Sequence, residues 1–155
     1  MTQSAPKALI SATPLPRERS ELLRLLLRGV EDIAPVIQRN KAASERARTL
    51  APEVVEAMRD TGLLMMKSPY EVGGAEIHPV DQMEVVEAVT YLDSAAAWSM
   101  FIAATVTGRA LSALSDEAVN ELFAGDVFPI MAGSLKPSGS ATPVDGGFRI
   151  SGQWA

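Results

Sequence analysis

The stretch "DTGLLMMKSPYEVGGAEIHPV" (residues 60–80) decides the fold, because it closes one helix and opens the next. The pair Thr61-Gly62 is typical of a helix C-terminus, where glycine adopts a left-handed conformation without strain. Pro69 and the pair Gly73-Gly74 then indicate a turn. Pro79 suits the first position of a new helix, since that position needs no backbone N–H. The stretch therefore predicts two helices joined by a structured turn.

Helical patterns also precede this stretch. From Ser20, apolar residues recur at three- and four-residue spacing, which predicts a helix with one buried face. Pro35 is expected to kink or restart that helix, and a second helix is predicted over residues 51–60. The predicted buried face of the first helix consists of Leu22, Leu26, Val30, Ile33 and Ile37.

Three more helices are predicted after the turn. The first opens at His78-Pro79, and its predicted apolar side carries Met83, Val86 and Val89. In "LDSAAAW", Asp93 can accept hydrogen bonds from the exposed amides of a fourth helix. The apolar run from Ala95 to Gly108 is interpreted as the body of that helix, buried in the protein. A fifth helix is predicted from residue 116 to about residue 123.

Beyond Gly125 the pattern changes from helical to extended. "VFPIMAGSL" (127–135) is a candidate buried strand, and "KPSGSATPVDGG" (136–147) is interpreted as loop and turn. In the final "GGFRISGQWA", apolar and polar residues alternate as in a strand that follows a glycine turn. A lone hairpin is marginal in water, so we expect the chain to be a fragment of a longer protein.

The fold class predicted from these patterns is mainly α. We expect a disordered leader over residues 1–19, an N-terminal helical domain over 20–125, and the start of a truncated middle β-domain over 126–155. These boundaries follow from the prolines near the N-terminus and from the change of pattern near residue 126.

Composition excludes several classes of protein. The 155 residues are 47% hydrophobic and 21% charged, as in ordinary globular proteins. Without cysteine there is neither a disulfide framework nor a Cys-based zinc site. The run from Ala95 to Gly108 is too short to cross a bilayer. Basic residues predominate up to Arg48 but alternate with acidic ones, which argues against nucleic acid. We expect a cytoplasmic protein that binds neither membrane nor nucleic acid.

Few residues suggest chemistry by themselves. His78 is the only histidine, and its position before Pro79 favours a capping or surface role over catalysis. Trp98 follows three alanines, and core packing is the first interpretation, with a surface approached by a partner or cofactor as the second. Met65-Met66 is interpreted as core. The segment "GSLKPSGSA" (133–141) is a candidate binding loop, because small residues with free amides can approach a phosphate or a planar ring, although most such segments are plain loops.

Taken together, two ordered blocks resemble the N-terminal part of the acyl-CoA dehydrogenase superfamily of flavoproteins. They are "RTLAPEVVEAMRDTGLLMMKSPYEVGGAEIHPVDQMEVVEAVTYLDSAAAW" (48–98) and "MAGSLKPSGSATPVDGGFRISGQW" (131–154). Within the superfamily they are most similar to the two-component flavin monooxygenases. Dehydrogenases usually carry Thr-Glu-Pro and Gly-Ser-Asp where this chain has Leu135-Lys136-Pro137 and Gly139-Ser140-Ala141.

The resemblance implies a fold and a chemistry. The family has a helical N-terminal domain, a middle β-barrel and a C-terminal helical bundle that forms a homotetramer. Its monooxygenases take reduced flavin, FAD or FMN, from a separate reductase and use oxygen to hydroxylate an aromatic or sulfur-containing small molecule. The cofactor-binding residues implied for this chain are Trp98, Ser134, Leu135, Pro137, Ser138, Gly139 and Ser140. No catalytic residue and no metal ligand is implied.

Two alternatives stay open. The first is an acyl-CoA dehydrogenase that oxidises an acyl-CoA with FAD. The second is a non-catalytic helical interaction module, which would associate through apolar residues left uncovered by an incomplete β-domain.

Overall fold

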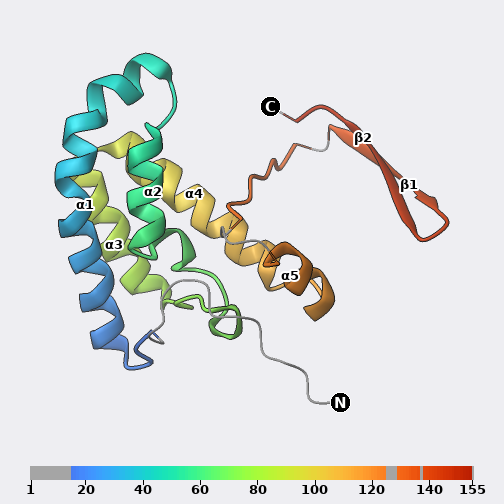
Figure 1. Cartoon of the computed structure of the whole chain (residues 1–155), viewed down its shortest axis with the longest axis horizontal. Helices are drawn as coiled ribbons and strands as arrows, with labels where there is room; N and C mark the ends of the chain where they lie inside the picture. The colour runs from blue at the N-terminus through green and yellow to red at the C-terminus, as the bar shows by residue number, and fades with distance from the viewer. Residues whose placement is uncertain (1–14, 125–128, 137, 155) are drawn as a thin grey trace.

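The computed structural model describes residues 15–124, 129–136 and 138–154, and it is mainly helical (Figure 1). The helical body is followed by one hairpin of two antiparallel strands, which confirms the predicted fold class. Its elements are α1 (Arg19–Ala47), α2 (Pro52–Asp60), the 3-10 turns η1 (Leu63–Met65) and η2 (Tyr70–Val72), α3 (Pro79–Leu92), α4 (Ser94–Leu111), α5 (Asp116–Leu122), β1 (Gly139–Val144) and β2 (Gly147–Gly152).

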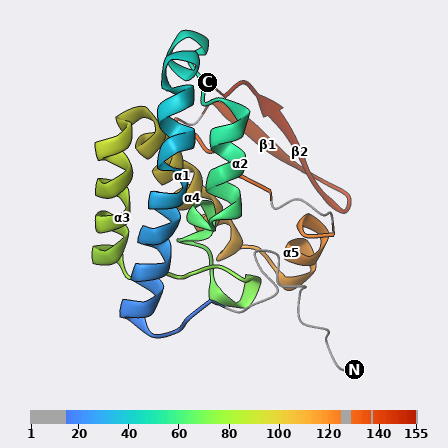
Figure 2. The same ribbon diagram turned by 60° about the vertical axis from the view of Figure 1, so that its left-hand side comes forward.

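Helix α1 organises the helical body. It packs against α2 on one side and α3 on the other, with α4 behind them (Figure 2). The five apolar residues predicted for its buried face are all buried. The helix continues without interruption through Pro35, so it does not restart there, and the alternative of a kink stays a prediction. None of the described helices is long and apolar enough to cross a membrane.

The predicted helix end and turn between α2 and α3 are confirmed. Gly62 follows α2 in the left-handed conformation at φ 75°, where a side chain would be strained. Gly73 does the same after η2 at φ 84°, and the N–H of Gly74 donates to the carbonyl of Pro69 at 2.9 Å. The methionines Met65 and Met66 are buried, as expected.

Side-chain caps fix where α3 and α4 begin. Nδ1 of His78 accepts a hydrogen bond from the N–H of Val80 at 3.2 Å, so His78 is the predicted capping residue. Oδ1 of Asp93 accepts from the N–H of Ala96 at 2.8 Å. The predicted apolar side of α3 needs a correction, because Val85 and Val89 enter the core while Met83 is 70% exposed. Helix α5 begins at the Ser115 cap, close to its predicted position.

The hairpin differs from the prediction in its strand limits. β1 covers Gly139–Val144, inside the segment predicted as loop, and β2 covers Gly147–Gly152. The described residues of the candidate strand 127–135 form no strand, and 127–128 lie outside the described residues. Every hairpin residue is exposed, because the helical body does not cover this sheet (Figure 1). The predicted division near residue 126 falls outside the described residues and stays a prediction.

An ion pair joins the start of α1 to the start of α3. Nε and Nη2 of Arg19 donate to the two carboxylate oxygens of Asp81 at 2.7 and 2.6 Å. The Asp81 side chain is only 3% exposed. The hydrogen bonds from Arg19 lower the pKa of the Asp81 carboxyl, and the same bonds raise the pKa of the Arg19 guanidinium. Both groups are therefore held in their charged forms.

This pair predicts acid-dependent stability. Because the folded-state pKa of Asp81 lies below its unfolded value, the contribution to stability is complete above the unfolded pKa and is lost as pH falls through the folded one. We expect Asp81→Asn to lower the free energy of unfolding at neutral pH, and its difference from the native protein to shrink as pH falls below about 4. Urea unfolding between pH 7 and pH 3 measures this difference.

The double substitution Arg19→Met/Asp81→Asn serves as the control. Removing Arg19 alone leaves a buried carboxylate unpaired, so Arg19→Met is expected to destabilise the protein more than the double substitution does. A difference between Asp81→Asn and the native protein that does not change with pH would contradict this explanation.

Candidate functional site

Helix α4 places Trp98 on the surface. Its buried face consists of small and medium side chains, including Ala97, Met100 and Ala104, so the helix lies close to its neighbours. Trp98 points away from this face and is 66% exposed, which overturns the first interpretation of Trp98 as core. The residue therefore offers a large aromatic surface that no described element covers.

A stripe of apolar side chains runs along the outside of α4. Trp98, Ile102 and Val106 follow one another at four-residue spacing and so share one side of the helix, here called the α4 outer face. Phe101 lies beside Trp98, with their ring centroids 6.3 Å apart and the planes tilted by 44°. Ala95, one turn before, is exposed and small, so a flat molecule could approach the backbone here.

The extended segment 129–136 passes the same helix near its C-terminal end. The N–H of Met131 donates to Oγ1 of Thr107 at 3.0 Å. A side chain at Gly133 would place its Cβ 3.1 Å from Cγ1 of Val106, so the segment runs close to the α4 outer face. Val106 lies two turns from Trp98, about 12 Å along the axis. Among the described residues, no hydrogen bond or ring contact joins Trp98 to residues 134–140.

The predicted binding loop is a tight, exposed turn. The N–H of Lys136 donates to Oγ of Ser134 at 3.3 Å, and the N–H of Ser138 donates to the carbonyl of Lys136 at 2.9 Å. Leu135 projects fully into solvent. Ser134 has a hydroxyl hydrogen left to donate, because its oxygen acts as an acceptor in this turn. Pro137, also predicted to bind cofactor, lies outside the described residues.

Gly139 and Ser140 belong to the hairpin and not to a loop. Gly139 pairs with Gly152, and a Cβ on either glycine would clash with the ring of Trp154. The lack of a side chain at Gly139 therefore makes room for Trp154 in this structure. Ser140 pairs with Ser151. Because Ser140 follows Gly139 directly in β1, its side chain points to the opposite face of the hairpin from position 139.

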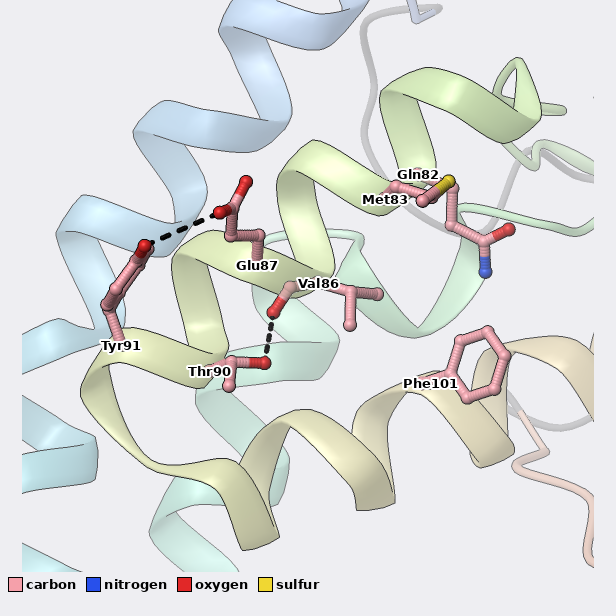
Figure 3. Close-up of a pocket in the computed structure, with 7 residues that line it drawn as sticks. All are labelled: Gln82, Met83, Val86, Glu87, Thr90, Tyr91 and Phe101. Atoms are coloured by element: carbon pink, nitrogen blue, oxygen red, sulfur yellow. Dashed lines mark hydrogen bonds between the residues drawn. The ribbon is translucent and has the colours of Figure 1, made fainter.

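A separate hollow of about 490 Å³ lies between α3 and α4 (Figure 3). It contains none of the predicted site residues. Gln82 of α3 and Phe101 of α4 point toward one another across it, while the hydroxyl of Tyr91 donates to Glu87 at 3.4 Å near its other end (Figure 3). The lining residues are Gln82, Met83, Val86, Glu87, Thr90, Tyr91 and Phe101.

Gln82 is an energetic weak point of this hollow. The residue is 6% exposed, and its Nε2 is buried without a hydrogen-bond partner. A buried donor without a partner costs about 1–3 kcal/mol, and an apolar side chain of similar shape avoids that cost. We expect Gln82→Met to raise the free energy of unfolding by about 1 kcal/mol in urea titrations.

Thr90→Val is the matched control for Gln82→Met. The Thr90 hydroxyl also lines the hollow, but it already donates to the carbonyl of Val86 at 2.7 Å. No comparable gain is expected there. Destabilisation by Gln82→Met would show that the amide makes a favourable bond and would contradict the prediction.

The helical body belongs to a known family. Residues 22–127 match the model of the acyl-CoA dehydrogenase N-terminal domain, so the chain belongs to that family. This match confirms the superfamily resemblance and covers the first of the two sequence blocks, residues 48–98.

Three curated relatives indicate more finely which kind of protein within this family the chain is similar to. The chain is 29% identical over 129 residues to an indole-3-acetate monooxygenase of Pseudomonas putida, covering 83% of this chain and 31% of the relative. It is 27% identical over 148 residues to the oxygenase component of an FADH(2)-dependent resorcinol hydroxylase of Rhizobium sp. (strain MTP-10005), covering 94% and 35%. It is 26% identical over 129 residues to the oxygenase subunit HsaA of a flavin-dependent monooxygenase of Mycobacterium tuberculosis, covering 83% and 32%.

The chain spans about a third of the length of these curated relatives. Their names agree with the finer resemblance to two-component flavin monooxygenases.

Sequence reasoning missed Thr107 as a residue that shapes the site, and it included Gly133 only as the first residue of the candidate binding loop 133–141. Thr107 and Gly133 join segment 129–136 to α4, yet neither stands out in the sequence. A weak signal exists for Thr107, because it falls at the helical spacing that the buried residues Met100, Ala104 and Leu111 follow. For Gly133 the sequence carries no signal beyond a glycine in a loop.

Proposed function

We propose that this chain forms part of the oxygenase component of a two-component flavin-dependent monooxygenase that hydroxylates an aromatic small molecule. The observation that carries the proposal is the exposed Trp98 beside Phe101, on the same side of α4 as Val106, which the segment leading to Ser134 approaches. Relatives named as aromatic hydroxylases match the chain over most of its length. The proposed cofactor is reduced FAD or FMN.

The residues present suit a planar, polar-edged ring. Trp98 offers an aromatic face, and stacking of such rings adds about 0.5–1.5 kcal/mol beyond their buried area. Exposed Ala95 leaves room beside it. Ser134 has a hydroxyl hydrogen to donate, whereas the N–H groups of Lys136 and Ser138 already donate within the turn. Gly139 supports the proposal less, because Trp154 already occupies the space beside it.

The division of labour follows from this chemistry. Reduced flavin, when bound, supplies the two electrons with which one oxygen atom of O₂ enters the substrate while the other leaves as water. The apolar α4 outer face would exclude water from the reacting molecules, and the Ser134 hydroxyl would donate a hydrogen bond to an oxygen or nitrogen at their edge. Trp98, Ser134, Leu135 and Ser138 are thus the proposed contact residues.

Further parts of the proposal concern partners and place. A separate reductase would supply the reduced flavin, and a small aromatic molecule would be the substrate. A cytoplasmic homotetramer is also proposed, since exposed apolar residues such as Met83 and Tyr91 are typical of surfaces that assembly covers.

The test uses the protein purified from its own gene, together with a flavin reductase, NADH and FAD or FMN. Resorcinol, indole-3-acetate and p-hydroxyphenylacetate serve as probes under ¹⁸O₂. The expected result is a hydroxylated product that carries one ¹⁸O atom, with oxygen uptake that depends on the aromatic probe. Peroxide is measured in parallel with and without catalase.

Two outcomes would contradict the proposal. If butyryl-CoA bleaches bound oxidised FAD without oxygen, the protein is an acyl-CoA dehydrogenase, the activity for which its family is named. If the protein binds no flavin and associates through the hairpin, whose residues Phe148 and Ile150 are 68% and 69% exposed, the non-catalytic interaction module is favoured.

A further inference from the structure

We propose that Thr107 is a positioning residue, whose buried hydroxyl holds segment 129–136 against α4 and thereby sets Ser134 beside the α4 outer face. This inference rests on the proposed function for its catalytic consequence, but its structural part stands independently.

Thr107 is an unusual residue for its position. It is fully buried on the core face of α4, in line with Met100, Ala104 and Leu111. A hydroxyl in such a place is costly unless it is hydrogen-bonded. Its Oγ1 accepts from the N–H of Met131 at 3.0 Å, although the two residues are separated by 24 positions in the chain. The hydroxyl oxygen of Thr107 is therefore hydrogen-bonded to the segment rather than to the helix's own backbone.

This bond is the main polar link between the segment and the helices. In the described part of the chain, no backbone–backbone hydrogen bond connects residues 129–136 to a helix. The remaining contacts are apolar and tolerate sliding, since Ile130 packs against both core clusters and Met131 against the second. A directional bond fixes the register that these contacts alone leave free.

The close approach of Gly133 to Val106 is a second reason why the register of the segment matters. Two residues beyond Met131, an extended chain has advanced by about 6.6 Å. At that point Gly133 lies against Val106, where an added Cβ would be 3.1 Å from Cγ1. Ser134 follows directly, so a slip of one residue would bring a side chain against Val106 and turn Ser134 to the other side of the segment.

Such a slip has a chemical consequence. A displacement of about 1 Å in a positioned group can cost about 10²-fold in rate. A displaced segment also admits water, which in an oxygen-using flavin enzyme favours release of peroxide over transfer of oxygen to the substrate. Thr107 is therefore expected to control how much of the consumed oxygen reaches the product.

The primary test compares Thr107→Val with Thr107→Ser in the full protein. Valine has nearly the same shape but cannot accept the bond, whereas serine can. With a reductase, NADH, flavin and the aromatic probes, Thr107→Val is expected to lower the ratio of product to oxygen consumed by at least about tenfold. Thr107→Ser is expected to restore this ratio to within about twofold of the native protein.

A second measurement does not depend on activity. Hydrogen–deuterium exchange of the peptide spanning 129–136 should be about 2- to 10-fold faster in Thr107→Val, as expected for the loss of one hydrogen bond, and unchanged in Thr107→Ser. Met131→Pro removes the N–H donor without a substitution in α4, so it serves if Thr107→Val fails to fold. The Met131→Pro protein should show the same fall in the ratio of product to oxygen as Thr107→Val.

The outcomes separate the two claims. Faster exchange in Thr107→Val with no hydroxylation by the native protein would support the positioning role and overturn the proposed function. Native-like exchange and a native-like product ratio in both Thr107→Val and Met131→Pro would overturn the positioning role. Equal losses in Thr107→Val and Thr107→Ser would also overturn it, because they would reflect packing rather than the hydrogen bond.

Discussion

Met100→Ala is expected to lower the free energy of unfolding by about 2–5 kcal/mol, as found for large-to-small substitutions in protein cores. Met100 has no exposed surface and lies on the face of α4 that packs into the main core cluster. The neighbouring alanines, Ala96, Ala97 and Ala104, are too small to refill the space. Urea unfolding followed by circular dichroism measures the change. The dependence of the free energy of unfolding on urea concentration is compared with that of the native protein.

Trp98→Ala is the matched control, two residues away on the same helix. Because Trp98 is 66% exposed, the change in stability is expected to stay within about 0.5 kcal/mol. Under the proposed function, the same variant loses flavin or substrate binding while it stays folded. If Trp98→Ala destabilised the protein as much as Met100→Ala, the outward position of Trp98 would be wrong.

Gly108→Ala is expected to destabilise the protein by about 1–3 kcal/mol, the range seen for overpacked cores. This loss of stability is opposite to the usual effect of a glycine-to-alanine substitution, since alanine in a helix interior is favoured over glycine by about 1 kcal/mol. An added Cβ at Gly108 would lie 2.6 Å from the carbonyl oxygen and 2.7 Å from the carbonyl carbon of Lys67. These are backbone atoms, so α4 and the loop after η1 would have to separate.

Gly147→Ala provides the control for Gly108→Ala. Nothing lies within 4 Å of an added Cβ at Gly147, and its φ is not in the left-handed region. The substitution is expected to leave the stability of the helical body unchanged. Thermal unfolding of the two variants beside the native protein makes the comparison, and a stabilising Gly108→Ala would contradict the close approach of α4 to Lys67.

The helices could be predicted from the sequence because their ends depend on local chemistry. Asp93 and Ser115 accept hydrogen bonds from amides within three residues, and Gly62 ends α2 through its own backbone conformation. These interactions need no distant partner. The spacing of apolar residues in α1 is likewise a property of one helix, so the five large apolar residues of its buried face were predictable.

Exposure was less predictable, because it depends on how helices pack. Trp98 is as hydrophobic as a core residue, but α4 approaches its neighbours through alanines and leaves the tryptophan outside. In α3, Met83 and Val85 are both apolar, and only the contacts with α1 and α4 decide that Val85 enters the core. The start of β1 was missed since Gly139, Ser140 and Pro143 are residues typical of loops.

The candidate site was only partly predictable, because it too depends on packing between segments that are distant in the sequence. The sequence indicated Trp98 and the loop around Ser134 as separate motifs, while the contact of Gly133 with Val106 joins segments 27 residues apart. Such long-range pairs leave no local pattern. The roles of Trp98, Ser134, Leu135, Ser138, Gly139 and Ser140 in cofactor binding remain predictions.

The contacts before α1 set a limit on how far the protein can be shortened. The guanidinium of Arg17 lies 3.7 Å from the ring centroid of Tyr70, whose hydroxyl donates to the carbonyl of Leu15 at 3.3 Å. Together with the Arg19–Asp81 ion pair, these contacts attach the N-terminal end of α1 to η2 and α3. A shortened protein beginning at residue 20 would keep nearly all of α1 but expose Asp81 and Tyr70. Affinity tags are therefore best attached before residue 15, where they leave these contacts in place.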